Sequence, residues 1–206
     1  KIRHAKTYSL SIFLVIVSLF TFLSYIQIGH WKDTATLFQD ALKTNPNNYM
    51  AFNILGSEES RKGNHEQALH YYQMALKIDP KYARAYSNAG NEYLKLGKYD
   101  EAHDFYQKAI SINGKLSDAH YNLGVLTLLM NKPSEAVVHF NKALTLTPNF
   151  VRAHFNVGVA FLKIGNYSGA TEHFEKALEL NPRHTEARKG LLISRELQKK
   201  KKPNDL

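Results

Sequence analysis

The sequence predicts an all-α fold in which helical hairpins stack into an α-solenoid. Glycines recur every 34 residues, and two sets of alanines with an aromatic residue between them recur at the same interval. The positions are Gly56, Gly90, Gly124 and Gly158; Ala68, Ala102, Ala136 and Ala170; Ala75, Ala109, Ala143 and Ala177; and Tyr72, Tyr106, Phe140 and Phe174. A unit of this length is two antiparallel helices that bury an apolar face only by stacking on a neighbour. Function is therefore expected on a long surface and not in a pocket.

The small and large positions have distinct predicted roles in packing. The glycine and the first alanine of each unit allow its two helices to approach closely. The aromatic ring four residues after that alanine is expected to fill the space between successive units. A bulky side chain at either small position should overpack the stack.

Helix ends are marked by residues that a helix does not tolerate. Proline closes the second helix of most units, and glycine takes that place once, because proline disfavours the helical conformation at and before its own position. These residues are Pro46, Pro80, Pro148, Pro182 and Gly114. The turn inside each unit carries a residue that tolerates a left-handed backbone. These turn residues are Gly63, Gly97, Asn131 and Gly165.

The repeats divide the chain into units of equal length. A half repeat is predicted at 31–48, and a capping helix with apolar residues on one face is predicted at 185–199. The segment 200–206 is expected to be a basic, disordered tail, and 1–30 an N-terminal flank with one membrane span. The four whole repeats are predicted at 49–82, 83–116, 117–150 and 151–184.

These residues resemble the tetratricopeptide repeat family. The run Asp-Ala-His-Tyr-Asn-Leu-Gly at 118–124 matches the family's first-helix pattern, and Ser-Glu-Ala at 134–136 matches its second-helix pattern. The resemblance covers about 31–199 and implies a tetratricopeptide-repeat superhelix. The aromatic residue often found four positions before the glycine is present in two units and is histidine in the others, which does not threaten the fold. These residues are Phe52, Tyr86, His120 and His154.

A long apolar segment precedes the repeats. No charged residue occurs from Thr7 to Gly29, and about 20 such residues span a bilayer as a helix, so residues 8–28 are predicted to cross a membrane. A cleaved signal peptide and a buried core helix are the alternatives. Lys1, Arg3 and Lys6 place the N-terminal flank in the cytoplasm by the positive-inside rule and the repeats outside it, in a periplasm or lumen.

The junction between span and repeats carries a second resemblance. The chain begins with lysine, so it looks like part of a longer protein or a processed product. Residues 25–33, the pair Leu37-Phe38 and residues 45–48 resemble the passage from membrane domain to repeats in the transmembrane tetratricopeptide O-mannosyltransferases and their bacterial relatives. The resemblance implies an upstream, multispanning domain that uses a lipid-linked sugar donor; its catalytic loop is not in this chain.

The tetratricopeptide resemblance implies that the first helix of each unit lines a concave groove. Asparagine recurs just before the glycine, and a row of amides suits gripping the backbone of an extended peptide. The alternative is that this asparagine belongs to the repeat consensus and stabilises local contacts. The groove is expected to be polar at its N-terminal half and more apolar further on, with lysines along one edge. Its predicted residues are Asn53, Asn88, Asn91, Tyr121, Asn122, Val125, Phe155, Asn156, Val159, Lys95 and Lys163.

Several other functions are disfavoured by composition. The chain has no cysteine, which excludes thiol chemistry, and its 10 histidines show no metal-binding spacing. Carboxylates are scattered, so no catalytic residue, cofactor or metal site is predicted. The net charge of +9 resides largely in the two ends, and no nucleic-acid partner is predicted. The run Lys199-Lys200-Lys201-Lys202 is expected to be a solvated tail, with anionic-lipid or acidic-partner contact as the alternative.

Two functions from different classes therefore remain. The first is a membrane-tethered scaffold, not an enzyme, that binds a protein or an extended peptide in its groove. The alternative is the C-terminal acceptor-recognition domain of a multispanning membrane glycosyltransferase. A carboxylate clamp for chaperone tails is disfavoured, because Asn53 and Ser57 stand where the clamp needs lysine and asparagine. The sequence upstream of Lys1 would distinguish the two functions.

Overall fold

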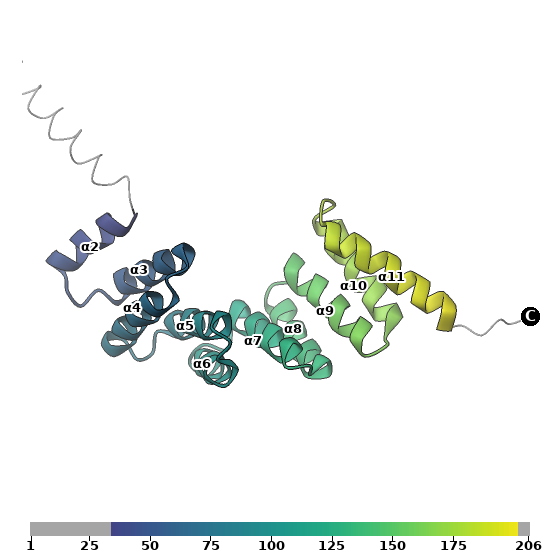
Figure 1. Ribbon diagram of the computed structural model, residues 1–206, viewed down its shortest axis with the longest axis horizontal. Helices are drawn as coiled ribbons and strands as arrows, with labels where there is room; N and C mark the ends of the chain where they lie inside the picture. Colours follow the sequence, from purple (N-terminus) through teal and green to yellow (C-terminus); the bar gives the residue numbers. More distant parts are fainter. Residues whose placement is uncertain (1–33, 202–206) are drawn as a thin grey trace, which may run out of the picture.

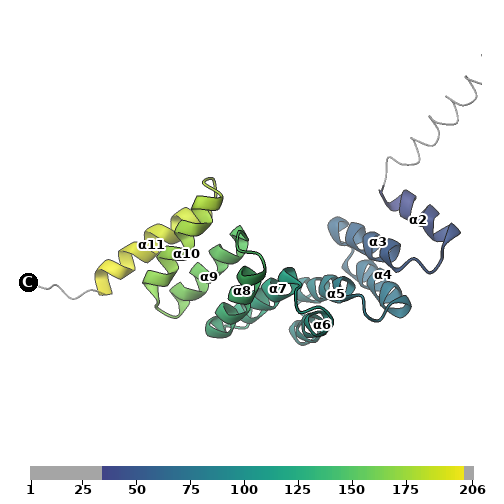
Figure 2. The same cartoon turned by 180° about the vertical axis from the view of Figure 1, so that it is seen from behind.

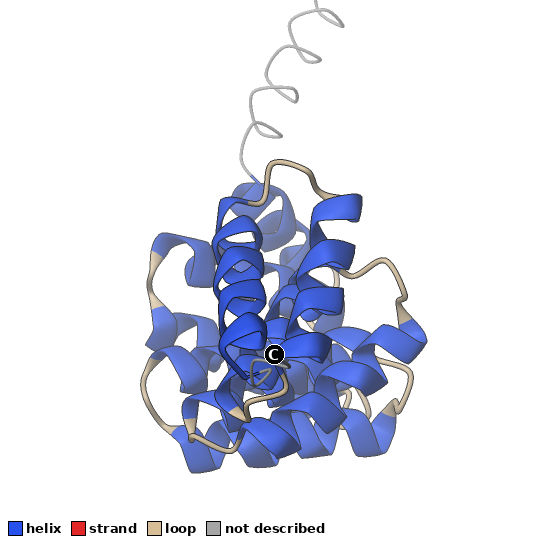
Figure 3. Cartoon of the chain, turned by 90° about the vertical axis from the view of Figure 1, so that its right-hand side faces the viewer, coloured by secondary structure: helices blue, strands red, loops and turns tan. Residues whose placement is uncertain are grey.

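The computed structural model describes residues 34–201, which form ten helices in a single elongated path (Figure 1). No strand occurs within this range (Figure 3). The predicted membrane span at 8–28 and the end of the predicted tail, 202–206, lie outside the described residues. The helices are α2 (Thr34–Thr44), α3 (Tyr49–Lys62), α4 (His65–Ile78), α5 (Ala83–Lys95), α6 (Tyr99–Ile112), α7 (Ser117–Leu129), α8 (Pro133–Leu146), α9 (Val151–Lys163), α10 (Tyr167–Leu180) and α11 (Thr185–Lys201).

Consecutive helices form four hairpins, α3 with α4, α5 with α6, α7 with α8 and α9 with α10. Figures 1 and 2 show these hairpins side by side along the molecule, with α2 before the first and α11 after the last. The first helices of neighbouring hairpins also contact one another, α3 with α5, α5 with α7, α7 with α9 and α9 with α11. No two second helices make comparable contact within residues 34–201. The solenoid therefore curves so that the first helices of the hairpins form its inner face.

The turns inside the hairpins carry the residues that the sequence predicts for a left-handed backbone. Gly63, Gly97 and Gly165 have φ of 84°, 72° and 75°, and Asn131 has φ of 58°. The side chain of Asn48 caps the start of α3, accepting a hydrogen bond from the backbone N–H of Ala51 at 3.0 Å, whereas Asn64 at the start of α4 makes no such cap. Such a cap stabilises a helix by about 1 kcal/mol.

Each aromatic ring of the repeat lies directly over the glycine of its own hairpin. A Cβ atom built on Gly56 would lie 2.6 Å from Cε1 of Tyr72, and one on Gly158 would lie 2.6 Å from Cε1 of Phe174. The same rings reach the next hairpin, as Tyr72 does in packing with Ala89. The sequence predicted that each ring fills the space between successive units. This prediction was incomplete, because the ring also packs between the two helices of its own hairpin.

The last helix is longer than predicted. α11 continues to Lys201 and does not end at 199, so the first residues of the predicted disordered tail are helical. Two contacts extend it: Nζ of Lys200 lies 2.7 Å from Oε1 of Glu196 one turn earlier, and Nζ of Lys201 donates to the backbone oxygen of Gly165 at 3.2 Å. Leu192 and Ile193 are exposed on the same helix, so its otherwise charged outer face includes two apolar side chains.

None of the helices between residues 34 and 201 has the length and apolar character needed to cross a bilayer.

Substituting Gly124 by alanine should destabilise the third hairpin. The new Cβ would lie 2.6 Å from both Cδ1 and Cε1 of Phe140, a ring that is fully buried and cannot move aside. Overpacking of this kind costs about 1–3 kcal/mol, which exceeds the gain of about 0.5–1 kcal/mol from replacing a helical glycine. Urea denaturation followed by circular dichroism measures the change.

Gly114→Ala is the matched control, because the nearest atom to its Cβ is the backbone oxygen of Ile110 at 3.7 Å. It should change the free energy of unfolding by less than about 0.5 kcal/mol. Equal stability of Gly124→Ala and Gly114→Ala would contradict the proposed role of the ring and glycine contact.

Candidate peptide-binding site

A polar hollow opens on the first helices of the first three hairpins. It has a volume of about 300 Å³ and lies among α3, α5 and α7, with Tyr72 contributed by α4. Four of the predicted groove residues line it together: Asn88, Asn91, Lys95 and Asn122. The remaining lining residues are Ser57, Ser60, Tyr72, Glu92 and Leu94.

The asparagines of this hollow are linked across hairpins. The amide nitrogen of Asn88 donates to Oδ1 of Asn53 at 2.9 Å, and that of Asn122 donates to Oδ1 of Asn91 at 2.8 Å. The hydroxyl of Tyr106 donates to the same Asn91 oxygen at 2.7 Å. Because a carboxamide has two N–H donors and an acceptor oxygen, Asn88 and Asn122 each retain one donor and the acceptor for another partner. The row therefore connects the hairpins and still offers polar groups.

The row continues in altered form in the fourth hairpin. The amide of Asn156 donates to the hydroxyl of Tyr121 at 3.0 Å, so a tyrosine takes the acceptor role that asparagine has earlier. Tyr121 packs against the ring of Phe150 at 4.8 Å between centroids, and the guanidinium of Arg152 lies 5.3 Å from the Tyr121 ring centroid. Burial raises the pKa of the Tyr121 phenol, which keeps it neutral and able to hydrogen-bond.

The predicted apolar half of the groove is largely engaged in packing. Phe155 is half-buried, with its ring 4.9 Å from that of His184 and 5.9 Å from that of Phe174. Val125 is half-buried against the core cluster that contains Phe140, and Val159 is half-buried against the cluster that contains Phe174. Lys163 is exposed at the end of α9 and does not line the polar hollow. The predicted residues thus form a polar hollow and a separate apolar stretch.

A buried carboxylate beneath the hollow was not predicted. Glu92 is 1% exposed, and its Oε1 accepts from Oγ of Ser60 at 2.6 Å and from Nζ of Lys95 at 2.9 Å. Its Oε2 lies 2.7 Å from Nδ1 of His65. Burial alone would raise the pKa of Glu92, but these three hydrogen bonds lower it below its usual value. The network ties the first hairpin to the second.

The repeat itself contains the signal that could have revealed this network. The position equivalent to Glu92 holds Leu126 and Ala160 in the next two hairpins, where both are buried, and Glu58 in the first hairpin, where the side chain is half-buried. A carboxylate at a position that is fully buried in the later hairpins needs a partner, because an unpaired buried charge is costly. Lys95 and Ser60 supply that partner, and Nζ of Lys95 also donates to Oγ of Ser60 at 2.7 Å. The positive charge at this edge is therefore balanced within the protein.

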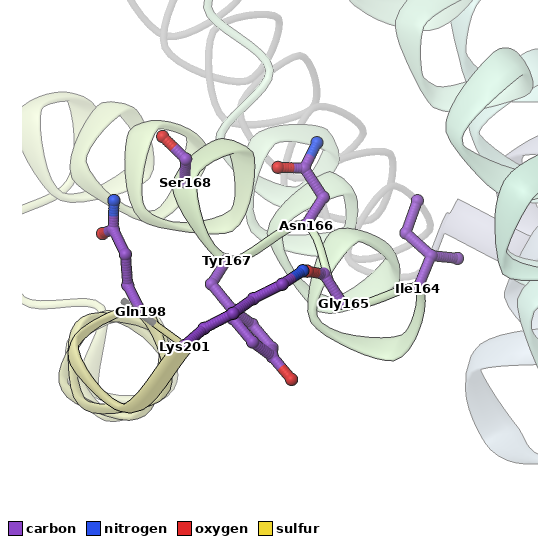
Figure 4. Close-up of a pocket in the computed structure, with 7 residues that line it drawn as sticks. All are labelled: Ile164, Gly165, Asn166, Tyr167, Ser168, Gln198 and Lys201. Atoms are coloured by element: carbon purple, nitrogen blue, oxygen red, sulfur yellow. The ribbon is translucent and has the colours of Figure 1, made fainter. Parts of the chain in front are cut away.

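A second hollow, of about 400 Å³, lies where the start of α10 meets the end of α11 (Figure 4). In this view Lys201 extends from α11 across Tyr167, and its Nζ lies 5.4 Å from the centre of that ring. Asn166 uses its side-chain oxygen to cap α10, accepting from the backbone N–H of Gly169 at 3.1 Å. These contacts attach the end of α11 to the last hairpin. Lys200 and Lys201 therefore have partners within the protein, and the predicted lipid contact of Lys199 to Lys202 stays a prediction.

Histidines and carboxylates form no group of three or more that could hold a metal ion between residues 34 and 201.

Comparison with known proteins supports the class of fold. Family models described as tetratricopeptide repeat match residues 50–115 and 151–184, and one described as TPR repeat matches 128–165. The chain therefore carries tetratricopeptide repeats. No match was found among curated proteins.

Solved structures agree with this class. The chain is similar to YrrB, described as a TPR protein with an unusual peptide-binding site, with 26% identity, a TM-score of 0.68, and coverage of 82% of this chain and 87% of that one. It is similar to MamA, with 28% identity, a TM-score of 0.62, and coverage of 71% and 85%. It is also similar to the first TPR of Spaghetti (RPAP3) bound to the HSP90 peptide SRMEEVD, with 27% identity, a TM-score of 0.57, and coverage of 59% and 96%. The resemblance to membrane glycosyltransferases finds no counterpart among these relatives.

Replacing Glu92 by glutamine should destabilise the protein at neutral pH. The neutral amide loses the charge that Lys95 and His65 face, and hydrogen bonds to a charged group contribute about 1.5–3 kcal/mol. Because the pKa of Glu92 is lowered by folding, its contribution is present above the pKa of the unfolded state and is lost as the pH falls through that of the folded state. Urea denaturation at pH 7 and at pH 3 measures the loss and its pH dependence.

Glu101→Gln is the control, because Glu101 is an exposed residue of α6. Its free energy of unfolding should fall by no more than about 0.3–1 kcal/mol at pH 7, from loss of a charge in the first turn of α6. If Glu92→Gln were as stable as Glu101→Gln at pH 7, the network would not contribute to the joint between the hairpins.

Proposed function

We propose that this chain is an interaction scaffold that binds an extended segment of a partner protein along its inner face. The observation that carries the proposal is the polar hollow on α3, α5 and α7, where Asn88 and Asn122 each keep an unused donor and acceptor. A peptide in extended conformation presents its own N–H and C=O groups at regular intervals. Side-chain amides can pair with both kinds of group, whatever the peptide sequence.

The charge of the hollow favours a partner held by its backbone and not by acidic side chains. Lys95 is the lysine that lines it, and Glu92 lies 2.9 Å from its Nζ. A peptide carboxylate would therefore compete with Glu92 for that ammonium group. This agrees with the sequence-based argument against a carboxylate clamp. The names of YrrB and of the Spaghetti complex record peptide binding by similar repeats, which supports the class of ligand.

The fourth hairpin favours an apolar side chain in the partner segment. Tyr121, Phe155 and Val159 are half-buried on α7 and α9, so part of each side chain faces solvent next to the row of amides. Covering this remaining apolar area contributes roughly 25 cal/mol per Å². The proposed ligand is thus an extended segment with a polar part and an apolar part.

Selection of peptides from a random library on the immobilised full chain tests this function. The double variant Asn88→Ala and Asn122→Ala should bind the selected peptides about tenfold or more weakly, because each lost amide hydrogen bond contributes about 1 kcal/mol. Fluorescence anisotropy with labelled peptides measures the affinity. The same double variant should also lose stability, since both amides link neighbouring hairpins.

Gln73→Ala with Gln107→Ala is the control, because both residues are exposed on the second helices α4 and α6. Its affinity should be unchanged. Circular dichroism at the assay temperature separates loss of binding from loss of folding in the asparagine variant. Equal affinity of a folded asparagine variant and the parent chain would contradict binding at the polar hollow.

Membrane attachment is the second part of the proposal. It is supported by the charge-free stretch 7–29, and the basic flank favours an extracytoplasmic position for the repeats. Residues 1–206 contain no cysteine, so Asn204→Cys introduces one site within them for a membrane-impermeant thiol reagent, and the parent protein gives the background labelling. Labelling of the full natural gene product in intact cells or spheroplasts is expected. Labelling only after lysis, with sealed lumenal compartments excluded, would contradict the orientation.

Acceptor recognition in a membrane glycosyltransferase is the second candidate function. It is supported by the junction residues 25–33, which resemble the point where such enzymes pass into their repeats. Sequencing the gene upstream of Lys1 tests it. Several further membrane spans with an acidic pair in the first extracytoplasmic loop are expected, and a reading frame that starts just before Lys1 would contradict it.

A further inference from the structure

Two equivalent positions of the repeat change from aromatic residues to histidine along the chain. In the first hairpin the rings of Phe52 and Tyr71 face each other across α3 and α4 at 6.4 Å, and in the second those of Tyr86 and Phe105 do so at 5.8 Å. The equivalent residues of the third and fourth hairpins are His120 with His139 and His154 with His173. A packing pair has thus been replaced twice by a pair of possible metal ligands.

In the fourth hairpin the two imidazoles meet through their nitrogens. Nδ1 of His154 and Nδ1 of His173 are 3.1 Å apart, although the residues come from different helices, α9 and α10. Sequence spacing did not reveal this pair, because the two histidines lie 19 residues apart and not one turn apart on the same helix. Two ligands about 2.0–2.1 Å from a tetrahedral zinc ion lie roughly 3.3 Å from each other. Small rotations of the two side chains would therefore bring both nitrogens onto one ion.

A backbone carbonyl orients His154 in the form that a metal needs. Its Nε2 lies 2.9 Å from the oxygen of Pro148, and because that oxygen can only accept, Nε2 carries the proton. In the neutral ring, Nδ1 then holds a lone pair that points toward His173. Metal-binding histidines almost always donate their second nitrogen in this way.

The surroundings leave room and negative charge for a cation. Both histidines border an open hollow of about 550 Å³ whose other residues come from α10. Glu175 is paired with Arg195 at 2.7 Å, and Glu179 is paired with Lys176 at 2.8 Å. Glu172, which also lines the hollow, forms no ion pair with any other residue in the range 34–201. Glu172 therefore leaves the hollow with a net negative charge, although it does not join the two histidines in a group of three metal-binding side chains.

The third hairpin lacks this arrangement and provides a comparison. His120 is only 8% exposed, its Nε2 lies 3.2 Å from the oxygen of Gly114, and its Nδ1 is buried without a hydrogen-bond partner. His139 turns toward Glu135, with Nε2 3.8 Å from Oε1 of that carboxylate. The two rings thus do not share a contact like that in the fourth hairpin, and Nδ1 of His120 is closed off from solvent.

We propose that His154 and His173 form a two-histidine binding site for a divalent transition-metal ion, with water completing its coordination. Imidazole ligands suit Zn²⁺, Cu²⁺ and Ni²⁺ and not Mg²⁺ or Ca²⁺. The site joins α9 to α10 on the hairpin that precedes the final helix α11. A bound ion would cross-link this hairpin and stabilise it by mass action.

Isothermal titration of the full chain with ZnCl₂ at pH 7.5 tests the proposal. Zn²⁺ should bind, and His173→Phe should weaken its binding about tenfold or more, because one of the two protein ligands is lost. Phenylalanine is the residue of the second hairpin at this position, Phe105, so the hairpin should still fold. His139→Phe makes the same change in the third hairpin and should leave Zn²⁺ affinity unchanged.

Two further measurements keep the outcome decisive. If His173→Phe unfolds, His173→Gln replaces it, since it retains a polar side chain. Nitrogen-15 spectra of the histidine rings should show Zn²⁺-dependent shifts of both Nδ1 atoms of the pair and no such shift at His139. Absence of binding, equal affinity in the His173 and His139 variants, or shifts confined to other histidines would each overturn the site.

Discussion

The fit of an aromatic ring onto a glycine is the contact on which the rest of the structure depends. In each hairpin the ring occupies the space that a Cβ atom on the opposite helix would need, with separations of 2.6–2.7 Å to that atom's position. The rings are 0–2% exposed and also reach the next hairpin, so one side chain closes its own unit and joins the following one. Burying such a ring stabilises the stack by about 1.5–3 kcal/mol. Because the contact recurs every 34 residues, all hairpins adopt one geometry, and their first helices share the inner face.

The inner face combines structural and binding roles in the same residues. Asn88 and Asn122 each use one donor to hold the preceding hairpin and keep the other groups available, and Glu92 balances the charge of Lys95 beneath them. A ligand at this place would meet polar groups whose positions are already fixed, so it would not have to order them itself. Such preorganisation lowers the entropic cost of binding. The proposed function therefore follows from the same cross-hairpin contacts that stabilise the solenoid.

The general fold could be predicted from sequence because its causes are periodic and local. The glycines and rings recur at one interval, and the turn residues Gly63, Gly97, Gly165 and Asn131 are those that tolerate a left-handed backbone. The candidate sites were predicted only in part, because they depend on single departures from the repeat. Glu92 is a buried carboxylate where the next two hairpins have apolar residues, and His154 and His173 meet across two helices, which no spacing along one helix reveals. α11 extends to Lys201, two residues beyond the predicted 199, and Lys201 in its last turn contacts Gly165, a residue distant in sequence. The predicted span at 8–28 lies outside the described residues.

Side-chain amide NMR tests the central claim most directly, because the proposed contacts involve amide groups that give their own signals. A library-selected peptide would be titrated into the nitrogen-15-labelled full chain, with asparagine signals assigned by single substitutions. The account predicts shifts of the Asn88 and Asn122 side-chain signals, with no shift of the exposed Gln73 and Gln107 amides on the second helices. Shifts confined to α4, α6, α8 or α10, with the inner-face asparagines unchanged, would contradict it.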